Sequence, residues 1–168
     1  MKVKKLTVVF VMAMVLVLVG VIPASARAER IYYTGATCPI YVGPPERMWI
    51  SEDNVLHMRG AYTDNILTSS SAYLDGTAVI IMNQDVDLNT GNVHAFGSFV
   101  ITPATLDGTW EGNFSTHVMG GVVRGSGTGH GTGALEGMLD FNHMSNPESY
   151  LPECNNINTN SSGYVLIP

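Results

Sequence analysis

The sequence predicts an antiparallel all-β domain, either a closed barrel or, as the alternative, a β-sandwich. No window of the mature chain repeats apolar residues at helical spacing, whereas stretches of alternating apolar and polar residues follow one another from residue 55 onward. Polar turns rich in Gly, Asn and Asp separate these stretches. About six to eight strands joined by tight turns are typical of a meander that closes on itself or packs as two sheets.

The first 26 residues have the composition of a secretory signal peptide. Three lysines precede an apolar run at 6–22, and an A-x-A site ends at Ala26. We therefore expect cleavage after Ala26, export to the periplasm or the extracellular space, and one domain of residues 27–168. An uncleaved membrane anchor is the alternative, because the apolar run approaches the lower limit for a span. That segment is the only membrane contact that we expect.

The mature chain is acidic. All three lysines lie in the signal segment, which leaves five arginines against fourteen carboxylates, and five minus fourteen gives a formal charge of −9. Such a surface repels phosphate backbones and anionic lipid head groups. We therefore exclude nucleic acid as a partner.

Seven segments of the mature chain have strand patterns. In the first, Leu56 and Met58 alternate with His57 and Arg59, as in a half-buried strand. The second is apolar on both parities, which indicates that both of its faces are covered. A proline-rich extended segment precedes these strands, and a polar loop over 153–163 precedes the last one. The seven segments are 55–62, 76–86, 92–102, 108–119, 122–135, 136–141 and 163–168.

Two tight turns are recognisable from their residues. Residues 87–92 (DLNTGN) predict a polar hairpin loop in which Asn89 and Gly91 suit positive φ. Gly120 and Gly121 suit a two-residue turn of the primed type. Both turns favour hairpins between strands that follow one another in the chain.

The stretch 125–133 (GSGTGHGTG) has a glycine at every second position. If the hairpin turns at 120–121, Trp110 lies opposite Gly131, and the ring of Phe114 also lies opposite a glycine. Contact with a ring offsets the roughly 0.5–1 kcal/mol by which each glycine weakens a strand. A glycine face also permits the sharp coiling that a small barrel needs. A strand therefore fits this stretch better than a phosphate-binding loop or a flexible linker.

The sequences at 108–121 (GTWEGNFSTHVMGG) and 125–141 (GSGTGHGTGALEGMLDF) resemble the glycine-spaced strands of the allene oxide cyclase and dirigent barrel superfamily. Residues 131–137 (GTGALEG) are similar to its G-x-G-x-L-x-G ending. The likeness covers 76–141 and implies an eight-stranded antiparallel barrel with an apolar lumen, often a dimer or trimer. Plant members cyclise or steer reactive lipid- or phenol-derived intermediates, and the resemblance places no catalytic residue on this chain.

Two cysteines remain, Cys38 and Cys154, near opposite ends of the mature chain. In an exported protein we expect them to form a disulfide. This bond would tether the polar C-terminal segment to the body of the domain. Two separate buried thiols are the alternative.

Glu111 and His130 are the candidates for acid–base chemistry, because the hairpin register places them opposite each other. His117 lies on the same face, and an exposed polar face is the plain alternative. We assign no metal ligand, since Glu111 and His117 are separated by about 20 Å at about 3.4 Å per residue. We expect no cofactor.

Aromatic and sulfur-containing side chains are the candidates for a ligand cavity. An eight-stranded barrel either fills with side chains or holds one small ligand, and glycines that face the lumen favour a cavity. The candidate lining residues are Trp110, Phe114, Phe96, Phe99 and Met82.

These observations predict a secreted barrel that binds a small apolar molecule and guides its cyclisation or isomerisation. The alternative is a non-catalytic secreted or surface module that acts through self-association, as a homo-oligomer, or through another partner. No convergent catalytic set is recognisable in the sequence, which keeps the second hypothesis open.

Overall fold

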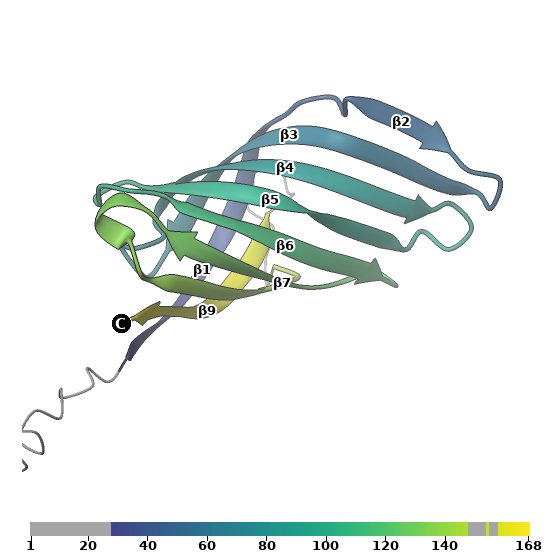
Figure 1. The fold of residues 1–168 in the computed structure, drawn as a ribbon. Helices are drawn as coiled ribbons and strands as arrows, with labels where there is room; N and C mark the ends of the chain where they lie inside the picture. Colours follow the sequence, from purple (N-terminus) through teal and green to yellow (C-terminus); the bar gives the residue numbers. More distant parts are fainter. Residues whose placement is uncertain (1–27, 148–153, 155–157) are drawn as a thin grey trace, which may run out of the picture.

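The protein is a closed antiparallel barrel of eight strands with one additional short strand (Figure 1). The computed structural model describes residues 28–147, 154 and 158–168, so the predicted signal segment lies outside the described residues. Within this part of the chain, no helix is long and apolar enough to cross a membrane. The predicted barrel is confirmed, and the sandwich alternative is wrong.

Nine strands and one short 3₁₀ turn make up the described fold. They are β1 (Glu29–Val42), β2 (Arg47–Ile50), β3 (Val55–Ser69), β4 (Gly76–Asp87), β5 (Val93–Pro103), β6 (Trp110–Met119), β7 (Val122–Gly131), η1 (Gly133–Leu135), β8 (Leu139–Ser145) and β9 (Thr159–Ile167).

The barrel closes where β1 pairs with β3. The strands follow the order β1-β9-β8-β7-β6-β5-β4-β3 around the barrel, and each neighbouring pair is antiparallel. Along one edge, β3 pairs with β1 over residues 63–69 and with β2 over residues 56–59. Two prolines at 44–45, which lack a backbone N–H, separate β1 from β2. β2 therefore continues the line of β1 and extends the wall beyond the closed barrel (Figure 1).

The β6–β7 hairpin has the predicted register. Trp110 pairs with Gly131, and Phe114 pairs with Gly127. Gly120 and Gly121 have φ angles of 57° and 79°, as a primed turn requires. The alternation of glycines is therefore a strand feature, as expected.

The groups that cover these glycines differ from the expected rings. A Cβ on Gly129 would lie 3.2 Å from the ring of Phe99, which comes from β5. On Gly131 it would lie 2.1 Å from the carbonyl oxygen of Leu135, so here the backbone of η1 is the close neighbour. The absence of a side chain therefore allows the Phe99 ring to pack against Gly129 and the backbone of η1 to pack against Gly131.

An apolar cluster around Trp110 plugs one end of the barrel. The Trp110 side chain is fully buried, and its indole N–H donates to the carbonyl oxygen of Tyr73 at 2.7 Å. Leu74, Leu135 and Val165 are buried in the same cluster. The loop that follows β3 and the η1 turn thus close this end, where the last residue of β9 also lies (Figure 1).

β1 and β2 lie in segments that were not predicted as strands, and β9 begins four residues before the predicted last strand 163–168. β1 begins at Glu29, and a register shift between Pro39 and Tyr41 interrupts its alternation, which hides the period of two. β9 begins at Thr159, inside the predicted polar loop 153–163. Its polar residues are compatible with a strand because Thr159 and Ser161 line a cavity and not a packed core.

Other strand boundaries also differ from the prediction, and β3 continues to Ser69, beyond the predicted end at residue 62. β7 ends at Gly131, because residues 133–135 turn back as η1. β8 spans 139–145, later than the predicted segment 136–141. Gly133 and Gly137 have positive φ, so the chain between β7 and β8 folds as a compact connection and cannot continue as an extended strand.

Cys38 and Cys154 form the predicted disulfide, across a sequence separation of 116 residues. The bond lies one residue beyond the end of the β1–β9 ladder, whose last pair is Thr37 and Thr159. It therefore holds the connection between β8 and β9 against β1. In the chain-entropy model a loop of this length contributes about 4–5 kcal/mol.

We predict that Gly131→Ala destabilises the barrel far more than Gly129→Ala. The new Cβ at position 131 meets backbone atoms of η1, whereas at position 129 it meets a ring that can shift. Overpacking at position 131 should lower the free energy of unfolding by about 1–3 kcal/mol, measured by urea denaturation. Equal losses in the two variants would contradict this account of the glycine face.

Candidate functional site

A cavity of about 450 Å³ occupies the barrel interior above the plug. All eight barrel strands contribute lining residues. The inward positions of β7 between Gly125 and Gly131 carry no side chains, so the wall on this side takes little volume. The glycine face therefore lets Thr116, Asn142 and Phe99 of other strands pack closely against β7, and these three side chains line the cavity.

The mouth of the cavity lies at the end opposite the plug. Val93, Val118 and Val123 line the cavity and lie beside the β4–β5 and β6–β7 turns. Figure 1 shows both turns at the end towards which β2 extends. The side chains at this end are mainly aliphatic, so the entrance presents an apolar surface.

Three of the five predicted lining residues face the cavity. Phe99, Phe114 and Met82 line it, on three neighbouring strands. Trp110 belongs to the plug beneath it. These positions depend on barrel closure, which determines the inward face of each strand.

The expectation for Phe96 is corrected by the structure. Ala95 and Phe99 face inward on β5, so Phe96 points to the outer face. There its ring lies 5.1 Å from the ring of His94 and beneath the guanidinium of Arg59. The segment 92–102 carries apolar residues on both parities, so the sequence left the inward face undetermined.

Glu111 and His130 pair across β6 and β7 as the register requires, but both side chains are exposed on the outer face. They do not face the cavity. His117, on the same outer face, stacks on His94 at 4.3 Å between ring centres. The part of the chain that the structure describes contains no group of three or more metal-ligating side chains.

A buried polar triad, which the sequence did not reveal, lies in the deep half of the cavity. The Tyr33 hydroxyl donates to Oδ1 of Asp140 at 2.7 Å, and Nδ2 of Asn142 donates to Oδ2 at 3.0 Å. All three residues line the cavity, and Asp140 is only 1% exposed. Tyr33 and Asp140 are 107 residues apart, so only the fold brings them together.

Burial raises the pKa of Asp140, although the hydrogen bonds from Asn142 and Tyr33 act in the opposite direction. Burial also raises the pKa of Tyr33, and the neighbouring charge of Asp140 adds to this effect. A carboxyl group with a raised pKa at the wall of a cavity is suited to proton transfer. Asp140 is therefore a better acid–base candidate than the exposed pair Glu111 and His130.

A second polar group comes from β3. Nδ2 of Asn65 donates to the carbonyl oxygen and the hydroxyl of Thr63, at 3.2 and 3.0 Å, and to the carbonyl oxygen of Ala78. Asn65 and Thr63 line the cavity and are at most 5% exposed. The cavity thus combines apolar walls with a few polar groups in fixed orientations, as ligand sites do.

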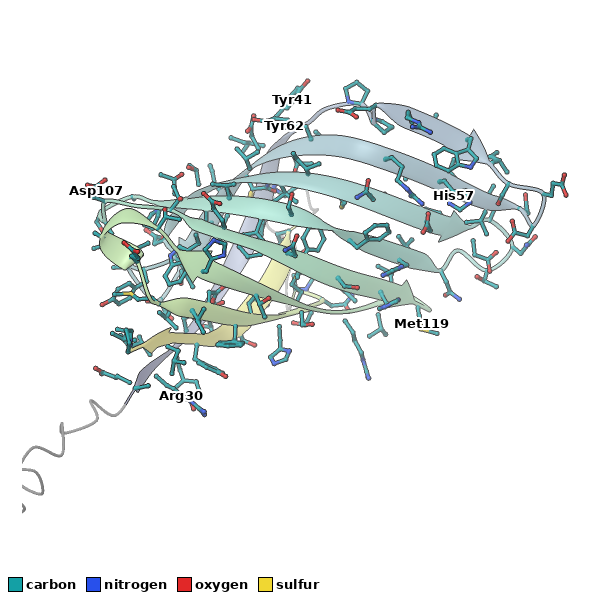
Figure 2. The ribbon with its side chains drawn as sticks, in the orientation of Figure 1. Arg30, Tyr41, His57, Tyr62, Asp107 and Met119 are labelled. Atoms are coloured by element: carbon teal, nitrogen blue, oxygen red, sulfur yellow. A yellow bond between two sulfur atoms is a disulfide. The ribbon has the colours of Figure 1, made fainter. Side chains whose placement is uncertain are left out.

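Outside the barrel, a serine, a histidine and an aspartate form a chain of contacts. His57 lies 2.6 Å from Asp85 through Nδ1 and 3.2 Å from the Ser51 hydroxyl through Nε2. However, the Ser51 hydroxyl donates to Asp53 at 2.5 Å, and its single proton cannot also be given to the imidazole. Figure 2 shows His57 on the extended part of the wall. We therefore assign this cluster no nucleophilic role.

We predict that Asp140→Asn changes the pH dependence of stability. Between the ordinary and the raised pKa of Asp140, the folded state retains a proton that the unfolded state has lost. The free energy of unfolding therefore falls as pH rises through this window, by about 1.4 kcal/mol for each pH unit that the window spans. Asp140→Asn should abolish this fall in urea denaturation measured across pH.

Asp107→Asn is the matched control, because Asp107 is exposed at the closed end of the barrel (Figure 2). It should not reproduce the effect. A profile of Asp140→Asn that parallels that of the unsubstituted protein would contradict the assigned burial of this carboxyl group.

A comparison with known proteins finds neither a family model nor a curated relative that matches this sequence. The resemblance to the allene oxide cyclase and dirigent barrels therefore stands on the glycine-spaced motifs between residues 76 and 141 alone. Function is consequently inferred from the cavity and from the residues that line it.

Proposed function

We propose that this protein is a secreted barrel that binds a small, largely apolar molecule in its central cavity. The cavity volume of about 450 Å³ carries the proposal. Ligand sites of roughly 300–1,000 Å³ with apolar walls and a few convergent polar groups are typical for small molecules. Phe99, Phe114 and Met82 supply apolar contact area in the walls.

The apolar wall continues beyond the mouth. Met48 and Ile50 on β2 are 64% and 60% exposed. They pair with Met58 and Leu56, in line with the inward-facing positions of the neighbouring strands. This exposed apolar surface beside the entrance favours the entry of a poorly soluble ligand.

Secretion is part of the proposal. The A-x-A site and the apolar run of the first 26 residues support it. The disulfide between Cys38 and Cys154 also supports it, since such bonds persist in oxidising compartments.

Cyclisation or isomerisation of the bound molecule is a further step of the same proposal. It is supported by Asp140, a buried carboxyl group at the cavity wall with the Tyr33 hydroxyl hydrogen-bonded to it. Such a pair can hold or move a proton beside a bound molecule. An enzymatic role would therefore depend on these two residues.

We predict that Val118→Trp blocks the cavity. Val118 lines the mouth, and an indole there would obstruct the entrance. The affinity for Nile red, a neutral apolar dye, should fall about tenfold or more, measured by fluorescence titration. Val100→Trp is the matched control, because Val100 is exposed on the outer face of β5. If the unsubstituted protein does not bind the dye, or if both variants bind it equally, the proposal fails.

A second candidate function is self-association through the free edge of β2, which pairs only with β3 among the described strands. An exposed edge with apolar side chains can recruit the same edge of a second copy. We expect the mature protein to sediment as a dimer and Met48→Lys to sediment as a monomer. Met119→Lys is the control, since Met119 is 63% exposed at the end of β6 (Figure 2). A strictly monomeric mature protein would exclude this candidate.

A further inference from the structure

Two amides that line the cavity, of buried Asn65 and half-buried Asn142, direct their nitrogen atoms at neighbouring acceptors. Nδ2 of Asn142 is directed at the carboxyl group of Asp140. Nδ2 of Asn65 is directed at the carbonyl oxygens of Thr63 and Ala78. Because these neighbours are acceptors, each amide must present its nitrogen to them and its Oδ1 elsewhere. The orientation of Asn65 is therefore fixed by its carbonyl neighbours, and that of Asn142 is fixed when Asp140 is ionised.

Both Oδ1 atoms retain accessible surface, although Asn142 Oδ1 also lies close to Gly127, where a Cβ would be 2.8 Å from it. Neither Asn142 Oδ1 nor Asn65 Oδ1 accepts a hydrogen bond from any other described residue. Among the described residues, every side-chain oxygen or nitrogen that is fully enclosed has a hydrogen-bond partner, so these two unpaired oxygens are not fully enclosed. Since both residues line the cavity, their amide oxygens are acceptors that a bound molecule can reach.

The cavity is also electrostatically one-sided. Among the described residues that line it, Asp140 is the one charged side chain, and none is Lys, Arg or His. Its two hydrogen-bond donors, the Tyr33 hydroxyl and the Asn142 amide, are neutral. The carboxylate therefore lies buried without a cationic partner, which is an unfavourable arrangement for an ionised group.

These properties discriminate between ligand classes. A carboxylate or phosphate would meet amide oxygens and a like charge, and both contacts are repulsive. An ester or ether offers only acceptors, so it would leave the amide oxygens unpaired and desolvated. An amine offers both hydrogen-bond donors and the missing positive charge.

We propose that the cavity binds an apolar primary amine, with its ammonium group against Asn142 Oδ1, Asp140 behind it, and its apolar body directed towards the mouth. This inference rests on the proposed function, because it names the ligand class of the same cavity. An amine is a stronger base than a carboxylate, so the proton of the pair stays on the amine. The valines at the mouth then surround the apolar end.

Displacement of Nile red by compounds that share a decyl chain tests the inference on the unsubstituted protein. Decylamine, decanol, decanoate and methyl decanoate are compared below their micellar concentrations. Decylamine should displace the dye at a concentration about tenfold or more below the other three. The inference is overturned if decanol displaces the dye at the same concentration as decylamine, or if decanoate displaces it at a lower one. Either result leaves the proposed function intact. If the dye and all four compounds fail to bind, the proposed function itself fails.

The variant Asp140→Asn sharpens the test. It removes the charge and places an amide beside the amide of Asn142. The new amide can offer its oxygen to Asn142 Nδ2 and its nitrogen to the Tyr33 hydroxyl, so the hydrogen bonds are retained and only the charge is lost. The preference for decylamine over decanol should then disappear. Asp107→Asn is the control and should retain the preference, whereas a retained preference in Asp140→Asn overturns the inference.

Discussion

The bare inward face of β7 is the constraint on which the rest of the structure depends. Between Gly125 and Gly131 every inward position lacks a side chain. At one level the ring of Phe99 fills the space, and at another the backbone of η1 folds back against the strand. Further along β7, the side chains of Asn142 and Thr116 pack against Gly127 and Gly125 and line the cavity. The same glycines thus admit both the plug and the side chains that form the cavity wall.

The plug and the cavity divide the barrel into two physical environments. Around Trp110, apolar side chains pack against one another. The indole N–H of Trp110 donates to the Tyr73 carbonyl oxygen, so the polar group of this side chain is paired. Directly above, Tyr33, Asp140 and Asn142 bury a carboxyl group that contributes nothing to apolar packing. Such groups destabilise a fold unless their hydrogen bonds are complete. Under the proposed function, their position at the wall of the cavity places them in contact with the bound molecule.

The seam of the barrel is its least regular part. β1 pairs with β9 only as far as Thr37, and its later residues pair with β3 across a register shift. Cys38 directly follows the last residue of β1 that pairs with β9. Its disulfide therefore links β1 to the β8–β9 connection where the backbone hydrogen bonds between β1 and β9 end. Beyond it, β2 extends the wall without a second neighbour among the described strands. The open mouth and the apolar surface beside it follow from this asymmetry.

The sequence by itself determined the antiparallel all-β class and the register of β6 with β7, and it predicted the closed barrel and the disulfide ahead of their alternatives. These features depend on local properties: the alternation of side chains along a strand, the positive φ that Gly120 and Gly121 allow, and the number of cysteines. Only the tertiary structure decided that Phe99 faces inward and Phe96 outward, and that Tyr33 meets Asp140. Both depend on how the sheet closes, because closure selects the inner face and joins strands that are distant in the chain.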